Sequence, residues 1–232
     1  MICQYSFSGY SEQYVHLGRK HPRQILIIPP FFEEMNRTRR LLLGAMRTLD
    51  EARIGTILPD LPGQNESLVP DGEISIGIWR AALERLTAQS GVIIDMIAAF
   101  RSGAILDDAV DCSRHWRFAP EDGPGLLRQL VRTRLAADRE AGIASSKTTL
   151  LTEARQQGML FAGWEIPFMM IQELEASGLP AHDEVRTVLL EGSSAPADAY
   201  VSGKPLWRQS EPQEDHWLAQ QIAADLAAWI GR

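Results

Sequence analysis

The sequence predicts an α/β protein, a mostly parallel sheet with helices on both faces, formed by one domain over residues 1–232. The chain has 232 residues, 45% of them hydrophobic and 23% charged, which is a globular composition with enough length to bury a core. Between residues 24 and 109, short β-branched or apolar runs alternate with segments of helical periodicity. Strand and helix in alternation indicate βαβ units with right-handed crossovers.

The first three elements are expected to be strands. Residues 3–7 and 14–17 flank a Ser/Gly turn and predict an antiparallel hairpin at the sheet edge. Residues 24–28 form a β-branched run that ends at Pro29 and Pro30, which cannot continue the hydrogen-bond ladder. This run predicts a buried, central strand.

The next elements alternate regularly. Apolar residues at helical spacing predict helices over residues 35–49 and 75–88, and residues 103–109 resume a helix. Residues 54–58 and 92–99 predict two further buried strands, the second being the most apolar. Ligands bind beyond the carboxyl ends of such strands, so we expect a site in the loops that begin at Pro29, Pro59, Phe100, Pro120 and Glu191.

The second half is less regular. Residues 115–119 and 185–190 predict strands, residues 200–201 one more, and residues 217–230 a closing amphipathic helix. Between them, helical patterns cover residues 126–140, 144–158 and 167–176, and residues 159–162 are short and apolar. We therefore expect residues 123–178 to form a small helical insertion or lid.

Residues 99–103 have the pattern of a tight strand-to-helix turn. Such a turn requires small residues two before and two after its apex, as in G-x-S-x-G. Ala99 and Gly103 meet this requirement with Arg101 at the apex, whereas an apex at Ser102 would place the bulky Phe100 at a flanking position. Arginine cannot act as an acyl nucleophile, so this frame indicates a binding protein or altered chemistry. A plain junction with a solvated arginine and a capping serine is the alternative.

Three segments resemble one family. Residues 29–40, PPFFEEMNRTRR, resemble its P-P-F-x-E-E-M-N-x-x-R-R motif; residues 58–63 are similar to L-P-D-L-x-G, and residues 100–104 to L-R-A-G-A. Residues 162–166, residues 205–207 and Glu211 are weaker matches. The chain thus resembles the α/β hydrolases, and among them the hydrolase 2 proteins associated with bacterial exosortase A systems. The resemblance implies an α/β-hydrolase fold and association with exopolysaccharide or protein-sorting machinery. It also implies that the arginine at the apex of the tight turn, called the nucleophile elbow in hydrolases, is shared with the family.

Catalytic candidates follow from the hydrolase chain order of nucleophile, acid and base. Ser102 is the hydroxyl at the elbow, and His216 precedes the last helix, where the base belongs. Glu191 and Asp122 are candidate acids. His216 has an ordinary alternative as an exposed histidine at the start of a helix. Glu191 and Asp122 have one as turn or helix-capping carboxylates.

The loop after residue 30 supplies candidate binding residues. Because prolines lack an N–H group, Phe31 and Phe32 offer the first amides for an oxyanion, and their rings predict a pocket wall. Glu33 and Glu34 lie near Arg39 and Arg40 in sequence, and we favour an ion-pair network that holds the loop over paired carboxylates in acid-base catalysis. Arg101 is expected to join this network or to bind an anion.

Three functions remain open. One is an esterase- or thioesterase-like hydrolase acting on a small-molecule or acyl substrate. The second is a catalytically silent protein that binds an anionic or acylated ligand or a protein partner, and the third is a purely structural component of a biosynthetic complex. A net charge of −7 argues against binding to nucleic acid, because such binding requires a surplus of Lys and Arg. Cys3 and Cys112 show no metal-ligand spacing, so we expect no metal. Residues 63–67 lack the G-x-x-x-x-G-K pattern of a phosphate loop, and we expect no cofactor. Without a leader or an apolar run of about 18 residues, we expect a cytoplasmic protein without membrane insertion, open to homo-oligomerisation.

Overall fold

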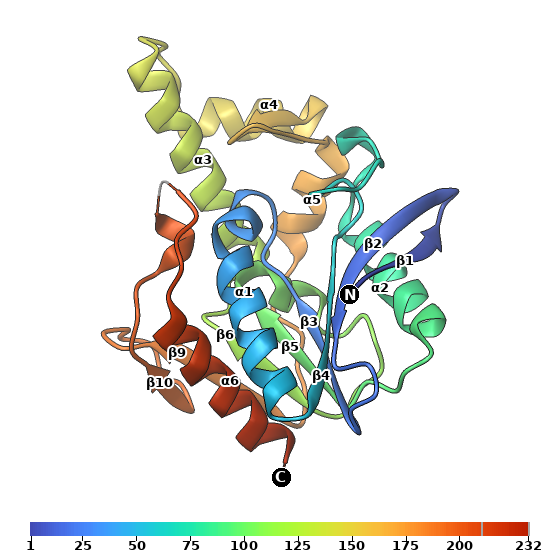
Figure 1. Ribbon diagram of the computed structural model, residues 1–232. Coiled ribbons are helices and arrows are strands. Elements are labelled where there is room, and N and C mark those ends of the chain that lie inside the picture. Colours follow the sequence, from blue (N-terminus) through green and yellow to red (C-terminus); the bar gives the residue numbers. More distant parts are fainter. Residues whose placement is uncertain (210, 232) are drawn as a thin grey trace.

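The computed structural model describes residues 1–209 and 211–231 and contains a sheet of eight strands in the order β1-β2-β4-β3-β5-β6-β9-β10 (Figure 1). β1 and β2 form the antiparallel edge hairpin, and β2 also pairs antiparallel with β4. The other pairings are parallel. The strands are β1 (Ile2–Phe7), β2 (Tyr10–Leu17), β3 (Arg23–Ile28), β4 (Ile54–Pro59), β5 (Met96–Phe100), β6 (His115–Phe118), β9 (Val185–Leu190) and β10 (Ala199–Val201).

Helices cover both faces of this sheet (Figure 1). α1 (Glu33–Glu51) and α6 (His216–Ile230) pack together over one face, where they meet Ile25 and Ile27 of β3. α2 (Ile76–Ser90) shares the opposite core with Leu26 and Ile28. Successive side chains of a strand point to opposite faces, so one apolar run fills both layers. The predicted fold class is confirmed.

The segment between β6 and β9 carries three helices and a small hairpin. They are α3 (Gly123–Glu140), α4 (Lys147–Gln157), β7 (Met159–Phe161), β8 (Trp164–Ile166) and α5 (Phe168–Ala176). α3 and α5 approach closely because Gly123 has no side chain: a Cβ there would lie 1.9 Å from the carbonyl oxygen of Leu174. Trp164 contacts Phe32, the second residue of the loop after β3 that follows the prolines, with ring centroids 5.9 Å apart. This segment therefore packs over the carboxyl ends of the central strands.

Three predicted elements differ from the structure. The strand expected over residues 14–17 begins already at Tyr10, because Ser8 and Gly9, with φ 47° and 85°, form the turn alone. The strand expected over residues 92–99 begins only at Met96, because α2 ends at Ser90, Gly91 caps it with φ 70°, and the chain then crosses to the sheet. Asp95 fixes the chain at this crossing, because its carboxylate accepts a hydrogen bond of 2.8 Å from the backbone amide of Gln24 in β3. The helix expected over residues 103–109 is a short 3₁₀ helix, η2 (Arg101–Leu106), a form used in brief connections. None of the described helices is both long and apolar enough to cross a membrane.

Candidate functional site

The turn after β5 places Arg101 at the carboxyl edge of the sheet. Arg101 has φ 52°, a left-handed backbone conformation that costs a non-glycine residue about 1–3 kcal/mol and persists only where its surroundings enforce it. Gly103 allows η2 to lie against β3, because a Cβ at this position would be 2.5 Å from the carbonyl oxygen of Pro29 and 2.6 Å from that of Ile28. Arg101 is thus the strained residue of this turn, and Ser102 follows it within η2.

The side chain of Arg101 is buried and fully engaged. Its Nε and Nη2 atoms donate to the carboxylate of Glu34 at 3.2 and 3.3 Å, and Nη2 also donates to Glu121 at 3.1 Å. Nη1 donates to the carbonyl oxygen of Ala119 at 2.6 Å, and the guanidinium carbon lies 4.6 Å from the ring centre of Trp207. All three guanidinium nitrogens therefore bind groups of this chain, and two carboxylates balance the charge.

Glu34 is the innermost acid of this cluster, 8% exposed. Burial raises the pKa of its carboxyl, and the neighbouring Arg101 guanidinium opposes that shift. The expected pairing of Glu33 and Glu34 with Arg39 and Arg40 is not what the structure shows. Glu33 binds Arg37 one turn later, and Arg39 binds Asp60 at 2.7 Å. Arg40 is exposed and has no ion pair within the described residues. The charged residues after β3 thus hold α1 and its neighbours together.

The hydroxyl of Ser102 is held inside the protein. Ser102 is 0% exposed, and its Oγ accepts the amide of Phe31 at 2.9 Å. The amide of Phe32, a residue with φ 57°, donates to the side-chain oxygen of Gln64 at 3.2 Å. The two amides expected to serve an oxyanion are therefore both bound to side chains of the same chain.

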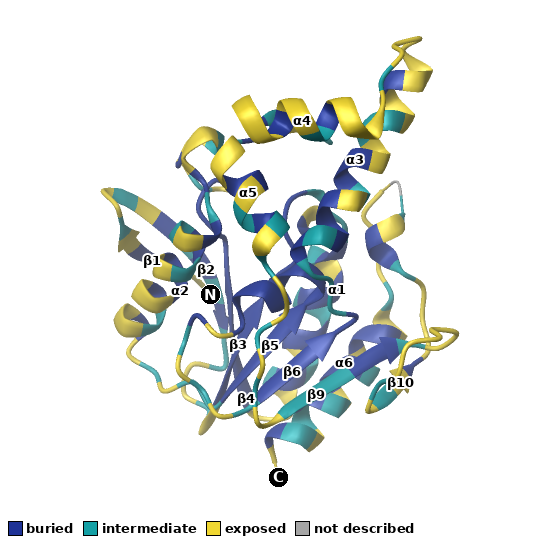
Figure 2. Ribbon diagram, turned by 180° about the vertical axis from the view of Figure 1, so that it is seen from behind, coloured by how far each residue is buried: buried dark blue, intermediate teal, exposed yellow. Residues whose placement is uncertain are grey.

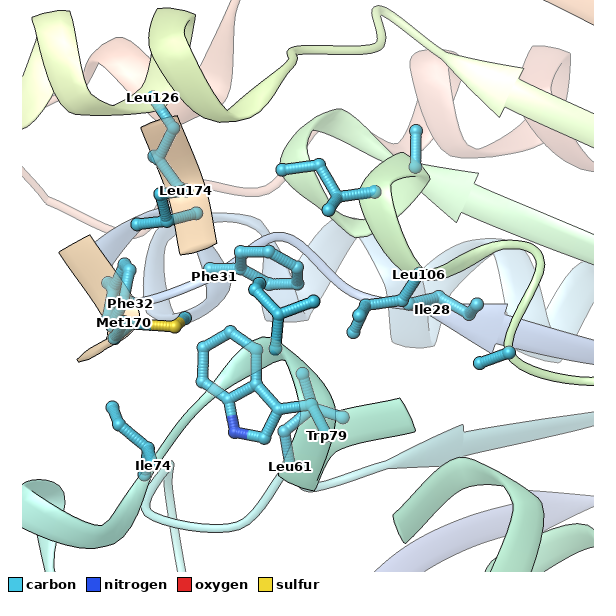
Figure 3. Close-up of a cluster of buried hydrophobic side chains, with 14 of the residues drawn as sticks. Ile28, Phe31, Phe32, Leu61, Ile74, Trp79, Leu106, Leu126, Met170 and Leu174 are labelled. Atoms are coloured by element: carbon cyan, nitrogen blue, oxygen red, sulfur yellow. The ribbon is translucent and has the colours of Figure 1, made fainter. Parts of the chain in front are cut away.

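The rings of Phe31 and Phe32 belong to the core beneath the α3–α5 segment. Their centroids lie 4.5 and 5.7 Å from that of Trp79, and Figure 3 shows both rings among the side chains of Met170 and Leu174. Both residues also border a cavity of only about 50 Å³. Within the described part of the chain, the two rings therefore pack in the core and border only this small cavity.

The remaining triad candidates lie apart from Ser102. His216 is the first residue of α6; 83% of its side chain is exposed, and it pairs with Glu214 at 3.3 Å. Glu191 is exposed just after β9, and Asp122 caps α3 by accepting a first-turn amide at 2.7 Å. Among the described residues, none of these three contacts the Ser102 hydroxyl.

A larger hollow opens beside Arg101, at the carboxyl ends of β6 and β9. It encloses about 490 Å³ and is bordered by Trp207 and Arg208 of η3 (Leu206–Arg208), by Glu191, and by the serines of the loop after β9. Its full lining is Arg101, Ala119, Pro120, Leu189, Leu190, Glu191, Gly192, Ser193, Ser194, Ala195, Gly203, Pro205, Trp207 and Arg208.

Sequence reasoning missed three residues of this region. Glu121 was not proposed as a partner of Arg101, and Trp207 and Arg208 were not proposed as lining residues. The weak motif match over residues 205–207 was the one signal that pointed to Trp207. Nothing in sequence spacing connects these positions with residue 101, because the fold alone brings them together.

One group of potential metal ligands lies elsewhere. Asp107, His115 and His182 offer ligand atoms within 4.8 Å of one another. Asp107 is already held by Arg117 through two bonds of 2.6 and 3.0 Å. The two imidazole rings stack with centroids 3.4 Å apart and planes 9° from parallel, so their in-plane lone pairs cannot meet at one ion. This arrangement is that of a structural network.

Comparison with known proteins identifies the fold. No family model and no curated protein matches the chain. Among solved structures, the ferulic acid complex of Est1E from Butyrivibrio proteoclasticus matches with TM-score 0.67 at 11% identity, over 99% of this chain and 100% of that one. Alpha/beta hydrolase domain-containing protein 10 from mouse matches with TM-score 0.62 at 15% identity, over 100% and 98%. The bottromycin epimerase BotH matches with TM-score 0.57 at 12% identity, over 98% of each chain. The chain therefore has the α/β-hydrolase fold.

Proposed function

We propose that this chain is a catalytically silent protein of the α/β-hydrolase fold, which binds an anionic or acylated small molecule in the hollow beside Arg101. The observation that carries the proposal is Arg101 itself, the residue with left-handed φ at the turn where hydrolases carry the nucleophile. Its guanidinium has no free nitrogen and cannot attack an acyl carbon. We interpret this turn as a degenerate nucleophile elbow.

The lining of the hollow supports the ligand class. Trp207 offers an aromatic wall, and the loop after β9 offers the hydroxyl groups of Ser193 and Ser194. Arg208 is exposed, and within the described residues its side chain has no ion-pair partner. A ligand with a carboxylate or phosphate at Arg208 and an apolar part against Trp207 satisfies these groups.

Calorimetric titration with phenyl phosphate and with hexanoate tests the binding. We expect saturable binding by the wild-type chain and weaker binding by the Arg208→Ala variant, while Arg132→Ala, an exposed position outside the hollow, leaves the affinity unchanged. Equal affinity in the wild type and in Arg208→Ala would remove the hollow from the proposal.

One observation favours a second function, an ester or thioester hydrolase. The Ser102 hydroxyl lies 2.9 Å from the amide of Phe31, so a hydroxyl and an oxyanion-type donor are adjacent. In this alternative Ser102 attacks, His216 is the base, and Glu191 or Asp122 orients it. Hydrolysis of p-nitrophenyl acetate and p-nitrophenyl hexanoate distinguishes the silent protein from the hydrolase. A silent protein gives equal rates in the wild type and in Ser102→Ala, whereas a hydrolase loses its activity in the variant.

The sequence motifs support a cellular setting. Residues 29–40 resemble a segment of proteins associated with exosortase A systems, so we propose that the chain works beside bacterial exopolysaccharide or protein-sorting machinery. Deletion of its gene in the source organism should lower exopolysaccharide yield, and a complementing Arg208→Ala copy should restore it only in part. An unchanged yield after deletion would contradict this setting.

A further inference from the structure

A second concave region lies between α3 and α4, and none of its lining residues lines the hollow. It consists of two adjoining cavities of about 250 and 500 Å³, which share Lys147 at the start of α4. The floor of the first is apolar, formed by Leu127 and Val131 of α3 and by Leu151 of α4. Figures 1 and 2 show α3 projecting beyond the sheet and meeting α4 at an angle, with much of both helices exposed. We call this region the α3–α4 groove.

The charges around the α3–α4 groove are uncompensated. Arg128, Arg139 and Lys147 line it, and within the described part of the chain none of these side chains has an ion pair or a hydrogen bond. The acid of the lining, Glu175, is held instead by Arg155, through three contacts of 2.6 to 3.0 Å. A chain with a net charge of −7 thus carries a local excess of positive charge at this groove.

An apolar floor with cations at its rim indicates a ligand that has an apolar part and an anionic group. The acyl chain of an amphiphile would lie along the floor, and a carboxylate or phosphate head would meet the cations. Leu127 and Val131 lie below the helix surface, at 4% and 2% exposure, so the surface of a bilayer cannot reach them, while Leu151 at the edge of the floor is partly exposed to an entering chain. The exposed apolar side chain of the lining is Ile143 at the tip, which is too little for insertion into a membrane.

We propose that the α3–α4 groove binds a free, single-chain anionic amphiphile, such as a medium-chain fatty carboxylate, with its head between Arg128 and Lys147. This site shares no lining residue with the hollow beside Arg101. This proposal is therefore independent of the function proposed above, and each can be tested without the other.

Calorimetric titration with decanoate below its micellar concentration tests this proposal. We expect one saturable site in the wild type. The double variant Arg128→Glu/Lys147→Glu should bind at least about tenfold more weakly, since two attractive contacts become repulsive. The matched control is Arg132→Glu, which reverses an exposed charge on α3 that does not line the groove, and its affinity should equal that of the wild type. Circular dichroism verifies that each variant is folded.

Further arms separate head, chain and site. Decanol and decyltrimethylammonium should bind more weakly than decanoate, and Leu151→Asp should weaken decanoate binding without reversing a rim charge. Arg208→Ala, which alters the hollow, should leave decanoate affinity unchanged. Equal binding of decanoate by the wild type and Arg128→Glu/Lys147→Glu, or loss in Arg208→Ala, would overturn the assignment. Sedimentation with phosphatidylglycerol vesicles that depends on Lys147 would overturn it in favour of a membrane surface.

Discussion

Replacing Arg101 by methionine removes the one cation that binds the buried carboxylate of Glu34 in a bidentate manner. Methionine keeps an unbranched apolar stem but leaves Glu34, at 8% exposure, without its partner. Glu121 also loses a contact, but 23% of its side chain is exposed, so water can replace the guanidinium there. Arg101→Met therefore tests the buried half of the cluster.

The expected cost is large. Breaking a buried ion pair by removing one partner costs about 3–5 kcal/mol, because an uncompensated charge remains. The guanidinium contact with Trp207 at 4.6 Å adds up to about 2 kcal/mol, and the methionine side chain recovers part of this loss through packing. We expect a net loss of about 3–5 kcal/mol, out of a total of about 5–15 kcal/mol for a folded domain.

Urea unfolding followed by circular dichroism measures this loss. Arg101→Met, Glu34→Gln and the double variant form a cycle, and we expect a coupling energy of about 1–3 kcal/mol between the two positions. Burial raises the pKa of Glu34, and in Arg101→Met the main opposing guanidinium is gone and only the smaller effect of Arg37 remains. The folded variant then holds a proton that the unfolded chain releases, so its stability falls as pH rises and the penalty is larger at alkaline than at acidic pH.

The matched control is Arg132→Met, which removes an exposed arginine of α3 and should change stability by less than about 0.5 kcal/mol. A free energy of unfolding for Arg101→Met within about 1 kcal/mol of the wild type, or single losses that simply add in the double variant, would contradict a coupled, buried ion pair. Either outcome would mean that Glu34 is hydrated or neutral in the native protein.

Three further outcomes follow from the fold. Gly103→Ala should destabilise strongly, because its Cβ meets two backbone carbonyls at 2.5 and 2.6 Å, whereas Gly178→Ala, which has open space, should not; thermal unfolding compares them. Asp122→Ala should cost about 1 kcal/mol in urea unfolding through the lost cap of α3, with no change in ester turnover. Burial lowers the pKa of His115, and the stacked His182 lowers it further. Below about pH 6.5, the unfolded chain therefore binds a proton at this histidine more readily than the folded chain does. Stability should fall on acidification from about pH 7.5 to 5.5, and less steeply in His115→Gln; an equal slope would contradict this cause.

The strand and helix pattern was readable from sequence because each element carries its own period. The run that became β3 is β-branched and stops at two prolines, and that local signal placed it in the sheet. The beginning of β5 was misplaced, since Val92 and Ile94 are apolar but belong to the crossing from α2. Periodicity cannot distinguish a buried loop residue from a strand residue.

The site was only partly readable. Ala99 and Gly103 flank Arg101 closely in sequence, so the unusual residue of the turn could be identified by spacing. Its partners Glu121 and Trp207 could not, because Glu121 follows β6 and Trp207 follows β10, and these segments meet only when β6, β9 and β10 lie side by side. Long-range contacts of this kind leave no periodic trace in a single sequence.

The proposed function requires that no hydroxyl at the turn after β5 acts as an acyl nucleophile. Intact-protein mass spectrometry after incubation with a fluorophosphonate tests it most directly, with a serine esterase in the same tube as a positive control. Because Ser102 is 0% exposed and Arg101 occupies the strained position, the account predicts an unmodified mass for the wild type. A single adduct that disappears in Ser102→Ala would contradict it.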